Sequence, residues 1–113
     1  MLIYKILTAA EWADLNRAGE FAGAAVDRAD GFVHFSTGAQ VAETAARHFA
    51  AQEGLMLLAF ESQALGVALK WEPSRGGALF PHLYGPLRLA DMAWARPLPL
   101  GPQGAHQFPA GLA

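Results

Sequence analysis

The chain has 113 residues, of which 53% are hydrophobic and 16% are charged, and its formal net charge is −2. These values fit one compact globular domain over residues 1–113, and they argue against a disordered chain or a general nucleic-acid binder. The absence of cysteine excludes disulfides and sulfur-ligated zinc, and no apolar run has the length of a membrane helix or signal peptide, so we expect a cytoplasmic protein without membrane contact.

The first elements are predicted from periodicity and capping. An alternating run of branched and aromatic residues predicts a strand over residues 2–7. Thr8 and Glu11 have the capping-box spacing, and the apolar stripe that follows predicts a helix over about 9–17. Residues 19–29 have no clear period, so we expect a surface loop there.

The middle of the chain predicts two further strands with a helix between them. Residues 30–35 form the second predicted strand, and a helical stripe predicts a helix over roughly 38–51. Ser36 or Thr37 is the expected N-cap of this helix. The nearly continuous apolar run over 54–61 predicts a buried central strand.

The last third predicts two more strands. Alternation indicates a strand over 66–72, and the proline- and glycine-rich segment 73–86 is expected to be a loop that contains at most a short strand. Residues 89–100 are predicted to form a final edge strand, and the tail from Gly101 is expected to be loosely packed or draped over the surface. Together these elements predict an α+β domain with two main helices and a curved, mostly antiparallel sheet.

The first candidate site residues, His34 and Ser36, lie at the end of the second predicted strand and just after it. Phe32, His34 and Ser36 share one face of this strand. In one interpretation His34 is a core histidine bonded to a backbone carbonyl and Ser36 is only a helix cap. In the other, the strand runs into a helix N-terminus, whose free N–H groups favour a phosphate or carboxylate beside His34.

The second candidate segment is the sequence FPHLYGP with the glutamate before it. In an extended path Phe80, His82 and Tyr84 point the same way, either as a rigid structural plug or as an aromatic platform that stacks on a planar ring. Glu72 ends a predicted strand, either as an exposed carboxylate or facing the same cleft as His34.

A metal site is not expected. His34, Glu72 and His82 are far apart in sequence, and no tight ligand motif is present. His48, on the helical stripe, and His106, in the tail, are interpreted as structural or exposed.

Three segments together resemble one known family. The sequences IYKILTAAEW, DGFVHFSTGAQV and WEPSRGGALFPHLYGPL are similar to the small bacterial proteins grouped as domain of unknown function 952 (DUF952), over roughly residues 2–100. The resemblance implies the fold of ADP-ribosyltransferases, which hold NAD in a cleft between two small sheets.

The resemblance also implies roles for the candidate residues. His34 would hydrogen-bond the ribose, Tyr84 or Phe80 would stack on the nicotinamide, and Glu72 would steady the developing oxocarbenium ion with His82 beside it. One departure is that Glu72 precedes the aromatic segment, whereas the acidic residue of active transferases usually follows it. The implied catalytic residues are Glu72, His34 and His82, and the implied ligand-binding residues are His34, Ser36, Phe80, His82 and Tyr84.

These observations lead to one functional hypothesis and two alternatives. The domain is expected to bind NAD or a related nucleotide and to transfer or hydrolyse at the ribose anomeric carbon, with NAD as substrate and with no required cofactor. The alternatives are a non-catalytic ligand-sensing or protein-interaction module on the same fold, and a His/Glu metal hydrolase. The sequence leaves open whether the protein is an enzyme, and it leaves the oligomeric state open.

Overall fold

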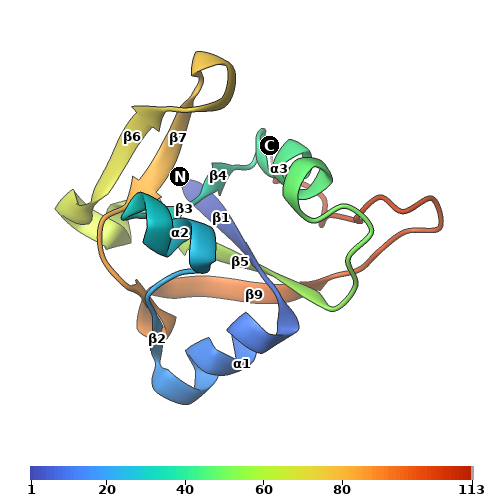
Figure 1. Cartoon of the computed structure of the whole chain (residues 1–113), viewed down its shortest axis with the longest axis horizontal. Helices are drawn as coiled ribbons and strands as arrows, with labels where there is room; N and C mark the ends of the chain where they lie inside the picture. Colours follow the sequence, from blue (N-terminus) through green and yellow to red (C-terminus); the bar gives the residue numbers. More distant parts are fainter. Residues whose placement is uncertain (113) are drawn as a thin grey trace.

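The computed structural model describes residues 1–112, without the side chain of Arg75 (Figure 1). The α-helices are α1 (Ala9–Ala18), α2 (Ala25–Asp30) and α3 (Val41–His48). The strands are β1 (Leu2–Leu7), β2 (Glu20–Phe21), β3 (Val33–His34), β4 (Ser36–Thr37), β5 (Leu55–Glu61), β6 (Leu69–Pro73), β7 (Leu79–Leu83), β8 (Leu87–Arg88) and β9 (Met92–Leu98). Short 3₁₀ segments are η1 (Ser62–Ala68), η2 (Arg75–Gly77) and η3 (Leu89–Asp91). No helix in the described part of the chain is both long enough and apolar enough to cross a membrane.

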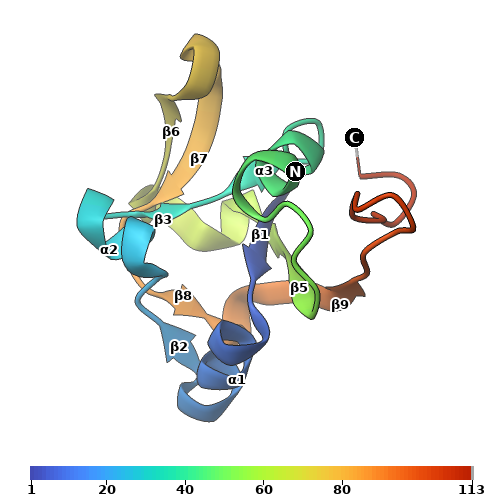
Figure 2. The ribbon, with the colours of Figure 1, turned by 45° about the vertical axis from the view of Figure 1, so that its right-hand side comes forward.

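The strands form three sheets in which every pairing is antiparallel. The largest sheet has the order β4-β1-β5-β9, the second pairs β2 with β8, and the third has the order β3-β7-β6. The predicted α+β class with antiparallel sheets is confirmed. In Figures 1 and 2 the β6–β7 hairpin projects from one end of the molecule and α1 lies at the other end.

The central strands of the large sheet are buried on both faces. Along β1, Ile3 and Leu7 pack into one hydrophobic cluster, and Tyr4 and Ile6 pack into another. The predicted central strand is confirmed, because β5 pairs with both β1 and β9 and also contributes to both clusters. Burial on both faces explains why the sequence of β5 is a continuous apolar run.

Two predictions for the first half of the chain have different outcomes. The first helix is confirmed, and Thr8 and Glu11 form the complete capping box of α1. The predicted loop over 19–29 is wrong, because this segment contains β2 and most of α2. Ala24, before α2, offers no side-chain cap, and instead the Asp27 carboxylate accepts its N–H. A six-residue helix is too short to be stable alone, so tertiary contacts decide its formation.

The predicted N-cap of the next helix is wrong. Ser36 and Thr37 form β4, which pairs with β1, and α3 begins only at Val41. Thr37 still bonds to the chain ahead of the helix, because the Gln40 side-chain oxygen accepts the Thr37 N–H at 3.0 Å. Pairing with β1 therefore keeps this segment extended for longer than the local pattern predicts.

The segment predicted as a loop over 73–86 contains a central strand. β7 pairs with β3 on one side and with β6 on the other, so pairing on both sides overrides its proline content. The predicted strand over 66–72 begins later, at Leu69, because η1 occupies Ser62–Ala68. The final edge strand is confirmed as β9.

Several contacts attach the C-terminal tail to the domain. Leu100 and His106 form an isolated β-bridge, and His106 Nε2 lies 2.8 Å from the Gln52 carbonyl oxygen. Phe108 and Leu112 are partly buried against the hydrophobic cluster that contains Tyr4. The tail therefore covers one side of the core.

Candidate functional site

The pairing of β3 with β7 places two histidines side by side. His34 lies directly opposite His82 in the ladder. Their ring centroids are 5.5 Å apart, with 68° between the ring planes. Because directly opposed side chains in an antiparallel pair are close neighbours, the sheet itself fixes this arrangement.

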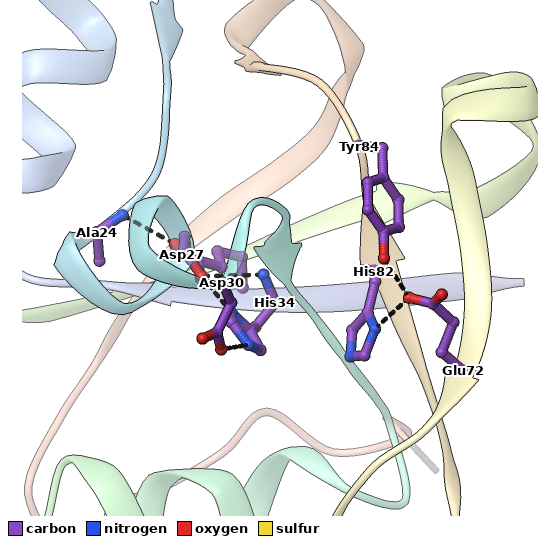
Figure 3. Close-up of polar contacts among 8 residues, drawn as sticks. Ala24, Asp27, Asp30, His34, Glu72, His82 and Tyr84 are labelled. Atoms are coloured by element: carbon purple, nitrogen blue, oxygen red, sulfur yellow. Dashed lines mark hydrogen bonds and ion pairs between the residues drawn. The ribbon is translucent and has the colours of Figure 1, made fainter.

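Each ring nitrogen of His34 meets a carboxylate from α2 (Figure 3). Nδ1 lies 2.6 Å from Asp27 Oδ1, and Nε2 lies 2.9 Å from Asp30 Oδ2. The Asp27 side chain is fully buried, whereas the Asp30 side chain is 46% exposed. Gly31, in the left-handed conformation, ends α2 and turns the chain into β3, which brings helix and strand together.

Asp27 is the buried centre of this arrangement. Its carboxylate accepts hydrogen bonds from Lys5 Nζ at 3.0 and 3.2 Å and from the backbone N–H groups of Ala24 and His34 at 2.8 and 3.0 Å. Burial raises the pKa of Asp27, but the hydrogen bonds from His34 and the charge of Lys5 outweigh it and hold the pKa well below its usual range. The carboxylate is therefore ionised at neutral pH.

Sequence reasoning missed Asp27 and Asp30, because both lie at or next to the segment predicted as a loop. A signal for the buried carboxylate is nevertheless present. Ile3, Lys5 and Leu7 are two residues apart along β1, so the Lys5 side chain points to the same inward face as the other two. A lysine on a buried face needs an acidic partner, and Asp27 provides it.

A second carboxylate fixes His82 from β6. Glu72 Oε1 lies 2.8 Å from His82 Nδ1 and accepts the Tyr84 hydroxyl hydrogen bond at 2.8 Å. The hydrogen bond from His82, and then that from Tyr84, lower the pKa of Glu72, and the same carboxylate raises the pKa of Tyr84. Glu72 is thus held as a carboxylate between an imidazole and a phenol.

The Phe32 ring lies close both to His34 and to the His82 and Tyr84 rings that Glu72 holds. Its ring centroid lies 4.0 Å from that of His82, in a stacked arrangement, 4.6 Å from that of His34 and 5.3 Å from that of Tyr84. We call Phe32, His34, Glu72, His82 and Tyr84 the histidine cluster. The structure therefore brings together four of the candidate site residues from the sequence, and adds Phe32 as their common neighbour.

Two other candidate residues have different surroundings. Ser36 is buried in β4, and its hydroxyl lies 2.7 Å from the Thr44 hydroxyl of α3. Phe80 is only 7% exposed, so it offers no open face for stacking. The interpretation that places a helix N-terminus beside His34 is wrong, because α3 begins seven residues later and β4 lies between them.

None of the five cluster residues lines either of two cavities in the described part of the chain. One, of about 360 Å³, lies between the N-terminal strand and the end of the tail, and the other, of about 290 Å³, lies between α3 and the tail. Within residues 1–112, no group of three or more His, Asp or Glu side chains has an arrangement that holds a metal ion.

The cluster combines groups that are suited to proton transfer and to binding a planar ligand. Two imidazoles have their Nδ1 atoms bound to carboxylates, which fixes the orientation of both rings. Tyr84 is 42% exposed and extends the aromatic surface outward from Phe32. His82, by contrast, is 4% exposed.

Comparisons with known proteins identify a family and solved structures of a related protein. The family model described as "Protein of unknown function (DUF952)" matches residues 6–95. The crystal structure of protein CC0527 from Caulobacter crescentus is 52% identical, covers 95% of this chain and 94% of that chain, and has a TM-score of 0.91. The solution NMR structure of CC0527 is 53% identical, covers 94% and 91% respectively, and has a TM-score of 0.85. A search of curated proteins finds no match.

Proposed function

The chain belongs to the DUF952 family of proteins of unknown function, and we propose that it binds NAD or a related nucleotide at the histidine cluster. The proposal includes an ADP-ribosyltransferase-like fold and a reaction at the anomeric carbon of the ribose that carries nicotinamide. The observation that supports it best is the meeting of two carboxylate-bound imidazoles at the Phe32 ring, beside an exposed tyrosine.

Binding would use the aromatic and polar parts of the cluster for different parts of the ligand. A base or a nicotinamide would stack on the exposed ring of Tyr84, in place of the Lys70 ammonium that lies 6.0 Å from its centroid. Stacking of one base on an aromatic side chain is worth about 1–3 kcal/mol by alanine substitution. The imidazole edges and the exposed carboxylate of Asp30 would hydrogen-bond ribose hydroxyls.

The reaction would depend on the fixed charge of Glu72. Breaking a nicotinamide–ribose bond develops positive charge on the sugar. A carboxylate that His82 and Tyr84 already hold in place stabilises that charge without reorganising, and therefore lowers the barrier more than it strengthens ground-state binding. The lowered pKa of Glu72 keeps it ionised at neutral pH.

Binding is tested by thermal shift and calorimetry with NAD, ADP-ribose and other adenine nucleotides. A ligand at one hundred times its Kd stabilises the folded state by about 2.7 kcal/mol, which raises the Tm by roughly 10 °C in a domain of this size. Tyr84→Ala should remove most of this shift. Trp71→Ala is the matched control, because Trp71 is similarly exposed, at 39%, but alternation places it on the face of β6 opposite Glu72. A flat response of the wild type at millimolar ligand would refute the proposal.

A second candidate function is a non-catalytic nucleotide sensor. One observation favours it: both ring nitrogens of His34 already have carboxylate partners. NAD consumption separates the two functions. If the domain is an enzyme, Glu72→Gln should lower turnover about a hundredfold or more while nucleotide affinity stays within a few-fold. Glu43→Gln, on the exposed face of α3, is the control that should leave both unchanged. Binding without turnover in the wild type would select the sensor.

A further inference from the structure

The two ring nitrogens of His82 have different surroundings. Nδ1 lies 2.8 Å from Glu72 Oε1, and an ionised carboxylate only accepts hydrogen bonds, so Nδ1 carries the hydrogen. In the neutral ring, Nε2 then has a lone pair and acts as an acceptor. No residue in the described part of the chain donates a hydrogen bond to Nε2, although His82 is only 4% exposed.

A buried acceptor without a donor indicates a group that comes from outside the chain. Buried polar atoms in proteins almost always have a hydrogen-bond partner. Phe32 does not block access to this atom, because it stacks on the flat face of the His82 ring with 27° between the planes. The lone pair of Nε2 lies in the ring plane and points out at its edge. Phe32 therefore leaves this edge of the ring uncovered.

His34 offers the opposite hydrogen-bonding role. Its two nitrogens lie 2.6 Å from Asp27 and 2.9 Å from Asp30, so both face carboxylate oxygens, which accept hydrogen bonds. Asp30 is 46% exposed, so it is the one of these two carboxylates that a ligand from solvent can reach. The cluster then presents an acceptor on His82 and a donor on His34, with ring centroids 5.5 Å apart.

We propose that His82 Nε2 receives the hydrogen of a hydroxyl group and is the general base of this site, with Glu72 as the residue that positions it. This inference rests on the proposed function. It specifies the molecule that receives the ADP-ribosyl group, which is water or an alcohol. The hydroxyl oxygen attacks the anomeric carbon of the ribose, and the bond from that carbon to the nicotinamide nitrogen breaks. Nicotinamide leaves with the bonding electrons, and the hydroxyl proton passes to Nε2.

The hydrogen-bonding roles of the two imidazoles favour a hydroxyl over other groups as the recipient of the ADP-ribosyl group. A carboxylate or a fully ionised phosphate has no hydrogen to donate to Nε2. A guanidinium has hydrogens to donate, but it has no lone pair with which to accept a hydrogen bond from His34. A neutral hydroxyl donates to one imidazole, accepts from the other and brings no charge.

The test combines one spectroscopic and two kinetic measurements. Imidazole ¹⁵N NMR of the wild type should show His82 with hydrogen on Nδ1 and none on Nε2, and needs no mutation. NAD turnover should give ADP-ribose with water and methyl ADP-ribose when methanol is added, and agmatine, which offers a guanidinium, should give no adduct. His82→Gln should lower turnover about a hundredfold or more, and should abolish the acid limb of the pH profile, while ADP-ribose affinity stays within about threefold. His48→Gln, exposed on α3, should change none of these.

The possible failures are distinct. Hydrogen on Nε2 of His82, an agmatine adduct, unchanged turnover in His82→Gln, or nucleotide binding without turnover would each overturn the hydroxyl-acceptor inference and leave the proposed binding standing. Absence of nucleotide binding to the wild type would overturn the proposed function, and the inference with it.

Discussion

Replacing Asp27 by asparagine removes the negative charge that four hydrogen-bond donors share inside the domain. Lys5 Nζ, the Ala24 and His34 backbone N–H groups and His34 Nδ1 all point at this carboxylate. In either orientation the new side-chain amide would turn its own hydrogens toward some of these donors, and Lys5, 8% exposed, would lose its counter-charge. Breaking a buried ion pair by removing one partner costs about 3–5 kcal/mol. Against a total stability of about 5–15 kcal/mol, this change should lower the Tm by more than about 10 °C.

Urea unfolding followed by circular dichroism measures this loss. Asp14→Asn is the matched control, because Asp14 pairs with Arg17 in an exposed i,i+3 ion pair whose loss should cost no more than about 0.5 kcal/mol. The double variant Lys5→Met/Asp27→Leu should be more stable than Asp27→Asn, since it leaves no unpaired buried charge. A loss of less than about 1 kcal/mol in Asp27→Asn would refute the assignment of Asp27 as the buried anchor of the site.

Three further results are expected. The lowered pKa of Asp27 means that its stabilising contribution is complete above the unfolded-state value of about 3.9 and is lost as the pH falls; the urea midpoint should therefore decrease below about pH 4, and less steeply in Asp27→Asn. Gly23→Ala should lower the urea midpoint more than Gly19→Ala, because both glycines have positive φ but only at Gly23 would the new Cβ meet Asp27 Cβ, at 2.5 Å. Glu72→Gln should lower the pKa of Tyr84 toward its ordinary value, which an ultraviolet pH titration detects; an unchanged Tyr84 titration would contradict the hydrogen bond between them.

The sequence predicts which residues belong to the site better than it predicts the strands and helices in which they lie. His34, Glu72, His82 and Tyr84 are recognisable because polar groups stand among apolar ones, and that signal is local. Their meeting depends on register between β3 and β7 and between β6 and β7, which is a long-range property that no local pattern encodes.

The carboxylates of α2 escape sequence-based prediction for a related reason. α2 is a short helix without a side-chain cap before it, and its own carboxylate Asp27 accepts the Ala24 N–H while also binding Lys5. Its formation and its ion pair therefore depend on one another. The Ser36 hydroxyl lies next to Thr44 of α3, because the pairing of β4 with β1 extends the chain past the expected helix start.

The central claim is that a nucleotide binds at the histidine cluster, and the four histidines of the chain provide a direct test. In a titration of the wild type with ADP-ribose and with NAD, followed by imidazole ¹H–¹⁵N NMR, the signals of His34 and His82 should shift in a saturable way. The signals of His48, on the exposed side of α3, and His106, in the tail, should stay in place as internal references. Four unmoved signals at millimolar ligand, or equal shifts of all four, would contradict nucleotide binding at this site.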